Sequence, residues 1–291
     1  MSHPSVIQGL RALGDRYDAI LCDVWGVIHN GREAYPGVVD CLRRFRQQGT
    51  ALLLSNAPRP SGPIREQLAS LGIPPDAYDA IVTSGDLTRE CLADLTQSGK
   101  VLKIHHVGPD RDLPLFDGLA VARVAMREAE AIVCTGPFDD TKEGPDDYRD
   151  YWQDALARQL PFYCANPDLV VERGADLIYC AGALAEDYER QGGPVVYLGK
   201  PHLPVYDFVA RRLEDAAGRP LPRSRWLAIG DGLRTDIRGA NRAGVDALLV
   251  TGGIHASELA DAQGAPDPAK IAAVLSAHSL SVVAATRRLV W

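Results

Sequence analysis

Short apolar runs, each closed by a polar residue, constrain the fold of this chain more than any other feature. They read DAILCD at 18–23, TALLLSN at 50–56, DAIVTS at 79–84, VVYLGK at 195–200, WLAIGD at 226–231 and ALLVTG at 247–252. Runs this short, rich in Val, Ile and Leu and not alternating with polar residues, suit parallel strands buried on both faces. The pattern predicts a parallel β-sheet.

Helix-like segments separate many of these runs. The clearest spans 36–48, with Pro36 near its start and Gly49 just past its end, and others span 64–71, 204–213 and 235–243. Alternating strands and helices indicate an open, doubly wound α/β sheet of the Rossmann-like kind, whose ligands bind at the carboxyl ends of the strands. The residues expected at that edge are Asp23, Ser55, Asn56, Ser84, Lys200 and Asp231.

A long insertion interrupts the series between Ser84 and Val195. It has its own helix-like segment at 84–99 and strand-like segments at 100–108, 129–137 and 160–168. We therefore predict a core formed by 1–84 and 196–291, with a smaller inserted α/β cap domain at 85–195. The insertion would leave and rejoin the core at its ligand-binding edge, where a lid belongs. The last segment, 281–291, is compatible with a closing strand or a short helix.

Composition narrows the partners and the compartment. A length of 291 residues suits two domains, and a net charge of −7 disfavours nucleic acid and membrane surfaces as partners. The N-terminus lacks an apolar signal segment, and no stretch approaches the length needed to span a bilayer. Six cysteines without a paired CxxC motif are typical of buried thiols in a reducing compartment. We expect a cytoplasmic protein.

Three aspartates carry the first chemical signal. Asp23 follows a buried strand and could be a covalent nucleophile toward phosphorus, although aspartates after strands are often turn residues. Asp231 and Asp236 span the end of a strand and the start of a helix, where a plain structural role is also common. Three carboxylates in one place would require a hard cation such as Mg²⁺.

Lys200, Ser55 and Asn56 carry the second signal. A lysine at the end of a buried strand could meet an anion and stabilise charge in a transition state, or could simply be solvated. Ser55 and Asn56 follow the second strand and could donate hydrogen bonds to a phosphate, although a plain turn explains them equally well.

In this order the residues resemble the motifs of the haloacid-dehalogenase-like (HAD) superfamily. The matching segments are Asp23-x-x-Gly26-Val27, Leu54-Ser55-Asn56-Ala57-x-Arg59, Gly199-Lys200-Pro201 and Gly230-Asp231-x-x-x-Thr235-Asp236. The large cap is similar to that of class IIA, which includes p-nitrophenyl-phosphatase-like and pyridoxal-phosphate phosphatases. Within the cap, the resemblance rests on Cys164-Ala165-Asn166-Pro167-Asp168 and on Ala181-Gly182-Ala183-Leu184.

The resemblance implies a role for each matching residue. Asp23 would be the nucleophile and a Mg²⁺ ligand, Asp231 a further ligand, and Asp236 would support the metal or its waters. Ser55 and Lys200 would hold the phosphate with Asn56 beside them, while Asn166 and Asp168 in the cap would face the substrate. The backbone carbonyl of residue 25 would be the third protein ligand of the metal. Relatives of this class often form homodimers through the cap.

One position departs from the family pattern. Most phosphatases of the superfamily carry a second aspartate two residues after the nucleophile, as general acid and base, and here that residue is Trp25. Substrates with good leaving groups, such as acyl phosphates, would need no such acid, or His29 could replace it. Trp25 could also stack on a substrate ring or serve packing.

We therefore expect a magnesium-dependent phosphatase that acts on a small phosphorylated metabolite through an aspartyl-phosphate. The alternative is a phosphometabolite-binding protein with negligible turnover. A dehalogenase-like hydrolase would also place an aromatic residue at position 25, but it needs no magnesium, and the Asp231/Asp236 pair argues against it.

Overall fold

The computed structural model describes residues 4–97, 99–173 and 176–291, which divide into two compact units. The first unit comprises the chain up to Ser55, Ile64–Val82 and Tyr206–Trp291. The second comprises Asn56–Pro63 and Thr83–Val205. The second unit therefore extends past 195, where the sequence analysis ended the cap.

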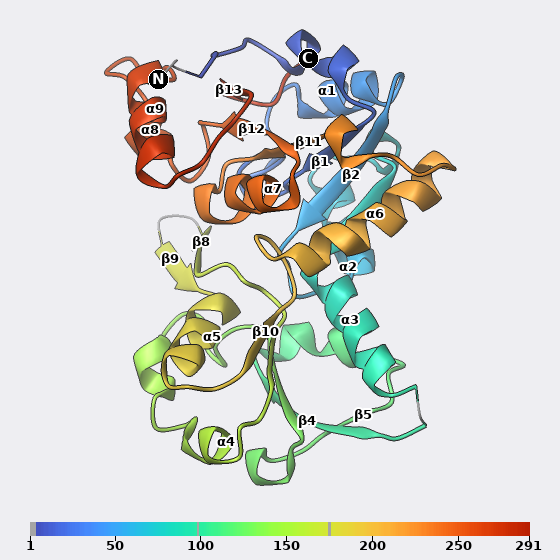
Figure 1. Cartoon of the computed structure of the whole chain (residues 1–291), viewed down its shortest axis with the longest axis vertical. Helices are drawn as coiled ribbons and strands as arrows, with labels where there is room; N and C mark the ends of the chain where they lie inside the picture. The colour runs from blue at the N-terminus through green and yellow to red at the C-terminus, as the bar shows by residue number, and fades with distance from the viewer. Residues whose placement is uncertain (1–3, 98, 174–175) are drawn as a thin grey trace. The chain divides into compact units, whose positions relative to one another are not determined.

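In the described part of the first unit, six strands form one sheet in the order β13-β12-β11-β1-β2-β3 (Figure 1). Strand β1 at its centre is buried along its whole length and pairs in parallel with both β2 and β11. The predicted doubly wound sheet is thus confirmed, and the C-terminal segment supplies a closing strand. The strands are β1 (Ala19–Cys22), β2 (Thr50–Ser55), β3 (Ala80–Thr83), β11 (Trp226–Gly230), β12 (Asp246–Val250) and β13 (Ala284–Thr286).

The helices around this sheet follow from apolar spacing. Helix α1 (Val38–Phe45) buries Val38, Cys41, Leu42 and Phe45, a stripe with the three- and four-residue spacing of a one-sided helix. The predicted helices at 36–48, 64–71, 204–213 and 235–243 are confirmed, the last one beginning with a π-helical turn, η8 (Leu233–Ile237). Besides α1, the helices that lie wholly or mostly in the first unit are α2 (Ser61–Ser70), α6 (Leu203–Ala217), α7 (Arg238–Ala243), α8 (Ala256–Leu259) and α9 (Pro268–Ala277).

In the described part of the second unit, five strands form a separate sheet in the order β10-β7-β6-β4-β5, with a small hairpin of β8 and β9. Helix α3 (Ser84–Leu95) begins at a capping box formed by Thr83 and Asp86. It occupies the segment predicted as 84–99, of which residue 98 lies outside the described residues. The remaining elements are β4 (Leu102–Val107), β5 (Val121–Arg123), β6 (Ala131–Cys134), β7 (Phe162–Cys164), β8 (Val170–Arg173), β9 (Asp176–Tyr179), β10 (Val195–Tyr197), α4 (Gln153–Ala157) and α5 (Ala181–Arg190).

The run at 195–200 corrects one prediction. Its apolar pattern predicts a strand of the core sheet, but β10 pairs with β7 at the edge of the second sheet. The physical reason is visible in its burial: Val196 is 38% exposed, and its neighbours Val195 and Tyr197 are only partly buried. A short apolar run alone does not tell an edge strand from a central one.

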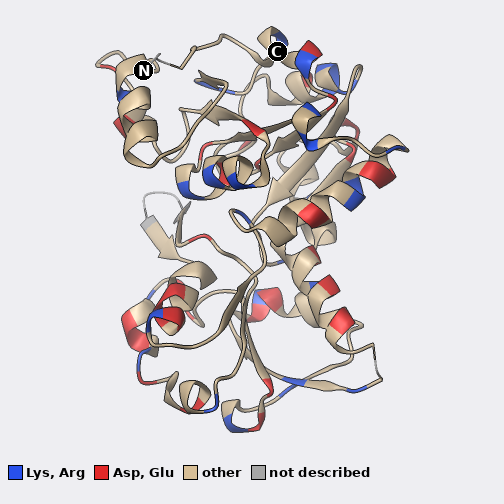
Figure 2. Ribbon diagram, viewed as in Figure 1, with Lys and Arg blue, Asp and Glu red and all other residues tan. Residues whose placement is uncertain are grey.

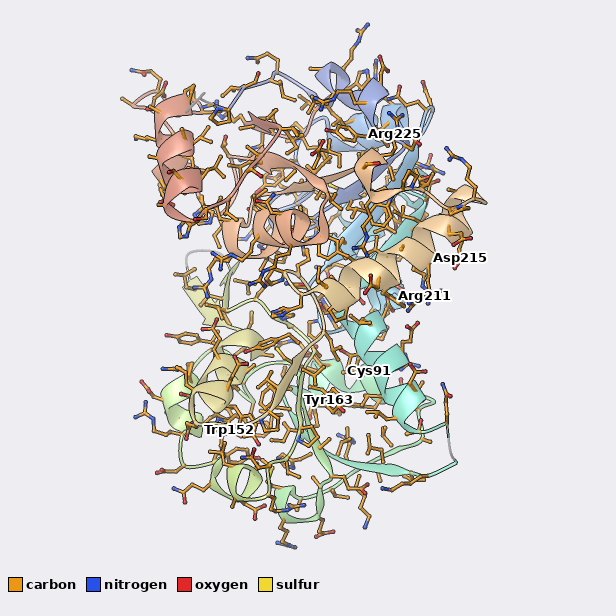
Figure 3. The ribbon with its side chains drawn as sticks, viewed as in Figure 1. Cys91, Trp152, Tyr163, Arg211, Asp215 and Arg225 are labelled. Atoms are coloured by element: carbon orange, nitrogen blue, oxygen red, sulfur yellow. The ribbon has the colours of Figure 1, made fainter. Side chains whose placement is uncertain are left out.

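Aromatic side chains fill much of the core of the second unit. Trp152 (Figure 3) is fully buried and contacts the rings of Tyr148, Tyr151, Phe162 and Tyr188. Its ring lies edge-on to three of them and stacks on Tyr148, geometries that aromatic pairs prefer. The second unit thus has a hydrophobic core of its own.

Charged residues lie along the helices (Figure 2), and most of the cysteines are buried. Acidic and basic residues are interspersed along the helices of both units (Figure 2). All six cysteines lie in the described residues and are free thiols, and all except Cys91 are buried. Among the described residues, no helix is both long enough and apolar enough to span a membrane.

Adjacent histidines on β4 face opposite sides of the second sheet. His105 Nε2 lies 2.6 Å from the Tyr151 hydroxyl, whereas His106 Nε2 lies 3.0 Å from Thr135 Oγ1. Burial, together with the nearby charges of Arg123 and His105 and against that of Asp110, lowers the pKa of His106 to about 4. The Thr135 hydroxyl also bonds the buried carboxyl of Asp112. His106 is therefore neutral in the folded protein at neutral pH.

This burial predicts an acid-side loss of stability. Below pH 6.5 the unfolded chain protonates His106, whereas the folded chain does so only near pH 4. The free energy of unfolding should therefore fall across this window, by up to about 3 kcal/mol from this group. His106→Gln can keep the bond to Thr135 without titrating. Urea unfolding between pH 7 and pH 4 should show a smaller decrease in the free energy of unfolding for the variant than for wild type. Equal decreases would contradict the prediction.

Candidate active site

Three carboxylates converge in the first unit. Asp23 directly follows β1, Asp231 directly follows β11, and Asp236 lies in the π-helical turn after that strand. Strands β1 and β11 are parallel neighbours, so their carboxyl ends lie side by side. One oxygen of each aspartate lies within 4.8 Å of the others, and the residues are only 9%, 6% and 5% exposed. The structure thus brings together the three aspartates that the sequence predicted.

Glycine backbone packs tightly against Asp231. A side chain added at Gly26 would place its Cβ 2.1 Å from Asp231 Oδ2, and one added at Gly253 would place it 1.8 Å away. Gly26 also has a φ of +82°, a conformation that favours glycine. The backbone N–H of Ile254 donates a hydrogen bond to Asp231 Oδ2 at 2.8 Å. The loop that contains Gly26 and the loop that contains Gly253 and Ile254 therefore fix the direction of the Asp231 carboxylate.

Asp236 is held by a backbone hydrogen bond and by the close packing of a glycine in its own segment. Its Oδ2 accepts a hydrogen bond from the backbone N–H of Gly232 at 3.0 Å, and a Cβ at Gly230 would lie 2.2 Å from its side chain. The π-helical turn that carries Asp236 is a rare geometry that recurs at functional sites. The Gly-Asp-Gly sequence is therefore required by close packing, because a larger residue at Gly230 would displace the aspartate.

The donor set matches a hard divalent cation. Three buried carboxylates this close repel one another unless a cation or a proton lies between them. Carboxylate oxygens suit Mg²⁺, which takes a few protein ligands and keeps positions for water and phosphate oxygens. No other group of three His, Cys, Asp or Glu residues in the described part of the chain has comparable ligand spacing.

Trp25 and His29 belong to a tight flap that follows Asp23. The Gly26 N–H donates to the His29 carbonyl at 2.9 Å, and the rings of Trp25 and His29 meet edge to face at 5.3 Å. His29 is 2% exposed, its Nδ1 accepts the Gly31 N–H, and burial lowers its pKa to about 4. The ring is therefore neutral near pH 7 with one nitrogen occupied, which weighs against His29 as a replacement acid.

A second cluster of predicted residues lies within the second unit. Asn56 is 4% exposed, and its side chain bonds Asp168, the Ser84 hydroxyl and both backbone groups of Lys200. Lys200 is itself 3% exposed. Asn166 is 8% exposed and accepts the backbone N–H of Asp168 through its Oδ1. The structure thus groups Asn56, Asn166, Asp168 and Lys200, while Ser55 is the last residue of β2.

Sequence reasoning missed the loop after β12. Gly253 and the N–H of Ile254 hold Asp231, yet neither was singled out. The available signal was the Gly252-Gly253 pair directly after a buried strand, since paired glycines mark places where backbone approaches another group closely.

Comparisons with known proteins agree with this architecture. Residues 20–114 match the family model described as haloacid dehalogenase-like hydrolase, and residues 197–277 match one described as HAD-hydrolase-like. A solved hydrolase of the haloacid dehalogenase-like family from Brucella suis 1330 is 44% identical, with a TM-score of 0.83, over 98% of this chain and 100% of that one. The chain belongs to the haloacid-dehalogenase-like hydrolases.

Two curated relatives define its branch of the superfamily. Chronophin from Bos taurus is 25% identical over 277 residues, which is 87% of each chain. Ribonucleotide monophosphatase NagD from Escherichia coli strain K12 is 26% identical over 254 residues, covering 85% of this chain and 92% of that protein. These relatives place the chain in class IIA, whose phosphatases generally use a divalent metal.

The packing of Gly253 predicts the effect of adding one methyl group. Gly253→Ala would place Cβ against Asp231 Oδ2 and displace the carboxylate, so cation affinity should fall by about 10- to 100-fold. Calorimetric titration with MgCl₂ measures it. Gly62→Ala is the matched control, because a Cβ there meets nothing within 4 Å and its affinity should equal that of wild type. Unchanged binding in Gly253→Ala would contradict the assigned geometry.

Proposed function

We propose that this protein is a magnesium-dependent phosphatase that hydrolyses a small phosphorylated metabolite through an aspartyl-phosphate on Asp23. The observation that supports the proposal most is the group of buried carboxylates at neighbouring strand ends in a chain of this family. The name of the relative NagD, a ribonucleotide monophosphatase, supports the substrate class. A cytoplasmic location and a homodimer through the cap remain predictions.

The metal would be held by Asp23, Asp231 and the backbone carbonyl of Trp25, with Asp236 supporting it or its waters. When bound, the ion would neutralise the carboxylates and polarise phosphate oxygens. Asp231 is pre-oriented for this role by the Ile254 N–H, and Asp236 by the Gly232 N–H.

In the first step a carboxylate oxygen of Asp23 attacks phosphorus, and the bond from phosphorus to the leaving oxygen breaks. In the second step water attacks the same phosphorus, the bond from phosphorus to the Asp23 oxygen breaks, and inorganic phosphate leaves as the carboxylate is restored, with the water's proton passing to the phosphate or to solvent. Ser55 would donate a hydrogen bond to the phosphate. Lys200 would offset the negative charge that accumulates on its oxygens. Asn166 and Asp168 are proposed to contribute to substrate recognition.

Trp25 determines which leaving groups suit this chemistry. Its side chain cannot give the leaving oxygen a proton, and neutral His29 is poorly suited to do so. The leaving group must then depart as an anion or take its proton from water. Acyl phosphates and other activated phosphates meet this requirement more easily than alkyl phosphates do.

The same position supports a second candidate, a phosphometabolite-binding protein with negligible turnover. Trp25 is 38% exposed and supplies no carboxylate, so a phosphate could bind without an efficient route to hydrolysis. Phosphate release under multiple turnover separates the two functions.

Removing the proposed nucleophile tests the enzyme directly. Asp23→Asn keeps the size of the side chain but cannot attack phosphorus, so phosphate release should fall by at least about 10³-fold. The assay is phosphate release from a panel of phosphorylated metabolites, with and without Mg²⁺. Asp246→Asn, at the opposite end of a strand in the same sheet, should retain wild-type activity. If wild type binds panel members in Mg²⁺ but releases no phosphate, the binding function is supported instead.

The missing acid predicts strong dependence on the leaving group. Compared with an enzyme that has an aspartate at position 25, this protein should have a kcat/KM about 10²- to 10⁴-fold lower for alkyl phosphates. Its kcat/KM for acyl phosphates should be little reduced. The measurement compares acetyl phosphate with an alkyl phosphate in wild type, Trp25→Phe and Trp25→Asp. The preference for acetyl phosphate should persist in Trp25→Phe and shrink in Trp25→Asp. The same ratio in all three proteins would show that position 25 does not control proton transfer.

A further inference from the structure

We propose that Asn56 is a positioning residue whose side-chain amide clamps the backbone of Lys200 and thereby directs that lysine toward the phosphate. The inference rests on the proposed function, in which Lys200 offsets phosphate charge. It assigns Asn56 a role different from direct phosphate binding, which its place in the sequence motif suggested.

The hydrogen bonds of the Asn56 side chain are saturated by protein groups. Its Oδ1 accepts the Lys200 N–H at 2.8 Å and the Ser84 hydroxyl at 3.2 Å. Its Nδ2 donates to the Lys200 carbonyl at 3.0 Å and to Asp168 Oδ1 at 2.9 Å. An asparagine amide has two donor hydrogens and two acceptor lone pairs, so nothing remains on this side chain for a phosphate oxygen.

The pattern of partners fixes which way the amide faces. Asp168 as a carboxylate can only accept a hydrogen bond, and the Lys200 N–H can only donate one. Reversing the amide would set oxygen against two acceptors and the amino group against the Lys200 N–H. Asn56 therefore hydrogen-bonds both the N–H and the C=O of Lys200, as a neighbouring β-strand would, although the two residues are 144 positions apart in the chain.

The surroundings leave the clamp little room to move. Asn56 is 4% exposed, and Ser84 is fully buried. A Cβ at Gly199, the residue before the lysine, would lie 2.6 Å from Asn56 Oδ1 and 2.2 Å from Ser84 Oγ. Only glycine lets the backbone before Lys200 come this close to the amide.

The consequence for catalysis follows from the length of a lysine side chain. Its four-carbon stem is flexible, so the position of the ammonium group depends on how firmly the backbone is held. A displacement of about 1 Å at a reacting centre can cost roughly 10²-fold in rate. A residue that bonds both backbone groups of Lys200 removes that freedom before the substrate arrives.

The test is a double-mutant cycle between Asn56 and Lys200, read by the affinity for inorganic phosphate in Mg²⁺ and by kcat for acetyl phosphate. Asn56→Ala alone should weaken phosphate binding and lower kcat by about 10- to 100-fold. In a Lys200→Met background the same substitution should change affinity and residual kcat by less than about twofold, because residues that act through one another are not additive. Equal fold-losses in both backgrounds would mean that Asn56 acts independently of the lysine and would overturn the proposal.

A matched control uses a second clamp of the same kind. Asn241 donates to the Ser281 carbonyl at 2.9 Å and accepts the Ser281 N–H at 2.8 Å. Asn241→Ala therefore breaks the same two bonds elsewhere in the chain, and phosphate affinity should stay at the wild-type value. A loss equal to that of Asn56→Ala would indicate a general effect on folding and would count against the proposal. If Asn56→Ala does not fold, Asn56→Ser replaces it.

Amide hydrogen exchange tests the clamp without any activity. The Lys200 N–H should exchange slowly in wild type and faster in Asn56→Ala, while its neighbours in β10 keep their protection. Unchanged exchange at Lys200 would overturn the clamp. If wild type neither hydrolyses nor binds phosphate, the proposed function fails and the role in directing Lys200 fails with it. Exchange then still decides whether the structural clamp exists.

Discussion

The mutual repulsion of three buried carboxylates is the constraint on which the first unit depends. With ligand oxygens within 4.8 Å, each pair of charges costs about 3 to 4 kcal/mol at an effective dielectric constant of roughly 20. A folded chain offsets such a cost by binding a cation, by taking up protons or by supplying hydrogen-bond donors. The parallel sheet brings two of the carboxylates to adjacent strand ends, and the turns that follow supply backbone N–H groups to Asp231 and Asp236.

Backbone N–H groups donate hydrogen bonds to both of these carboxylates. The Ile254 N–H and the Gly232 N–H each bond one carboxylate oxygen, and glycines at 26, 230 and 253 allow the approach. A backbone donor on a short loop has few ways to move, so it orients a ligand before the metal arrives. In the second unit the arrangement is reversed, because the Asn56 side-chain amide holds the backbone of Lys200.

Much of the fold could be predicted from sequence, because buried parallel strands have a strong local signature. The strands ending near Asp23, Ser55 and Asp231 were found with nearly correct bounds. The strand before Lys200 was assigned to the wrong sheet, since an apolar run does not report its pairing partner. The three aspartates could be grouped because they end neighbouring elements. The bonds from Asn56 to Lys200 and from Ile254 to Asp231 could not, because they join segments far apart in the chain through geometry that no local pattern encodes.

Trp25 has a structural function in the flap that follows Asp23. A Cβ at Gly31 would lie 2.4 Å from Trp25 Cη2, so the indole packs directly on that glycine, whose φ is +85°. The Gly31 N–H in turn bonds His29 Nδ1, and the His29 ring meets the indole edge to face. Trp25, His29 and Gly31 therefore stabilise one conformation of the flap. An aspartate at position 25 would supply a carboxyl group but remove that packing, so one side chain cannot serve both purposes. The indole keeps the flap ordered, and in the proposed phosphatase it requires substrates whose leaving groups need no proton from the enzyme.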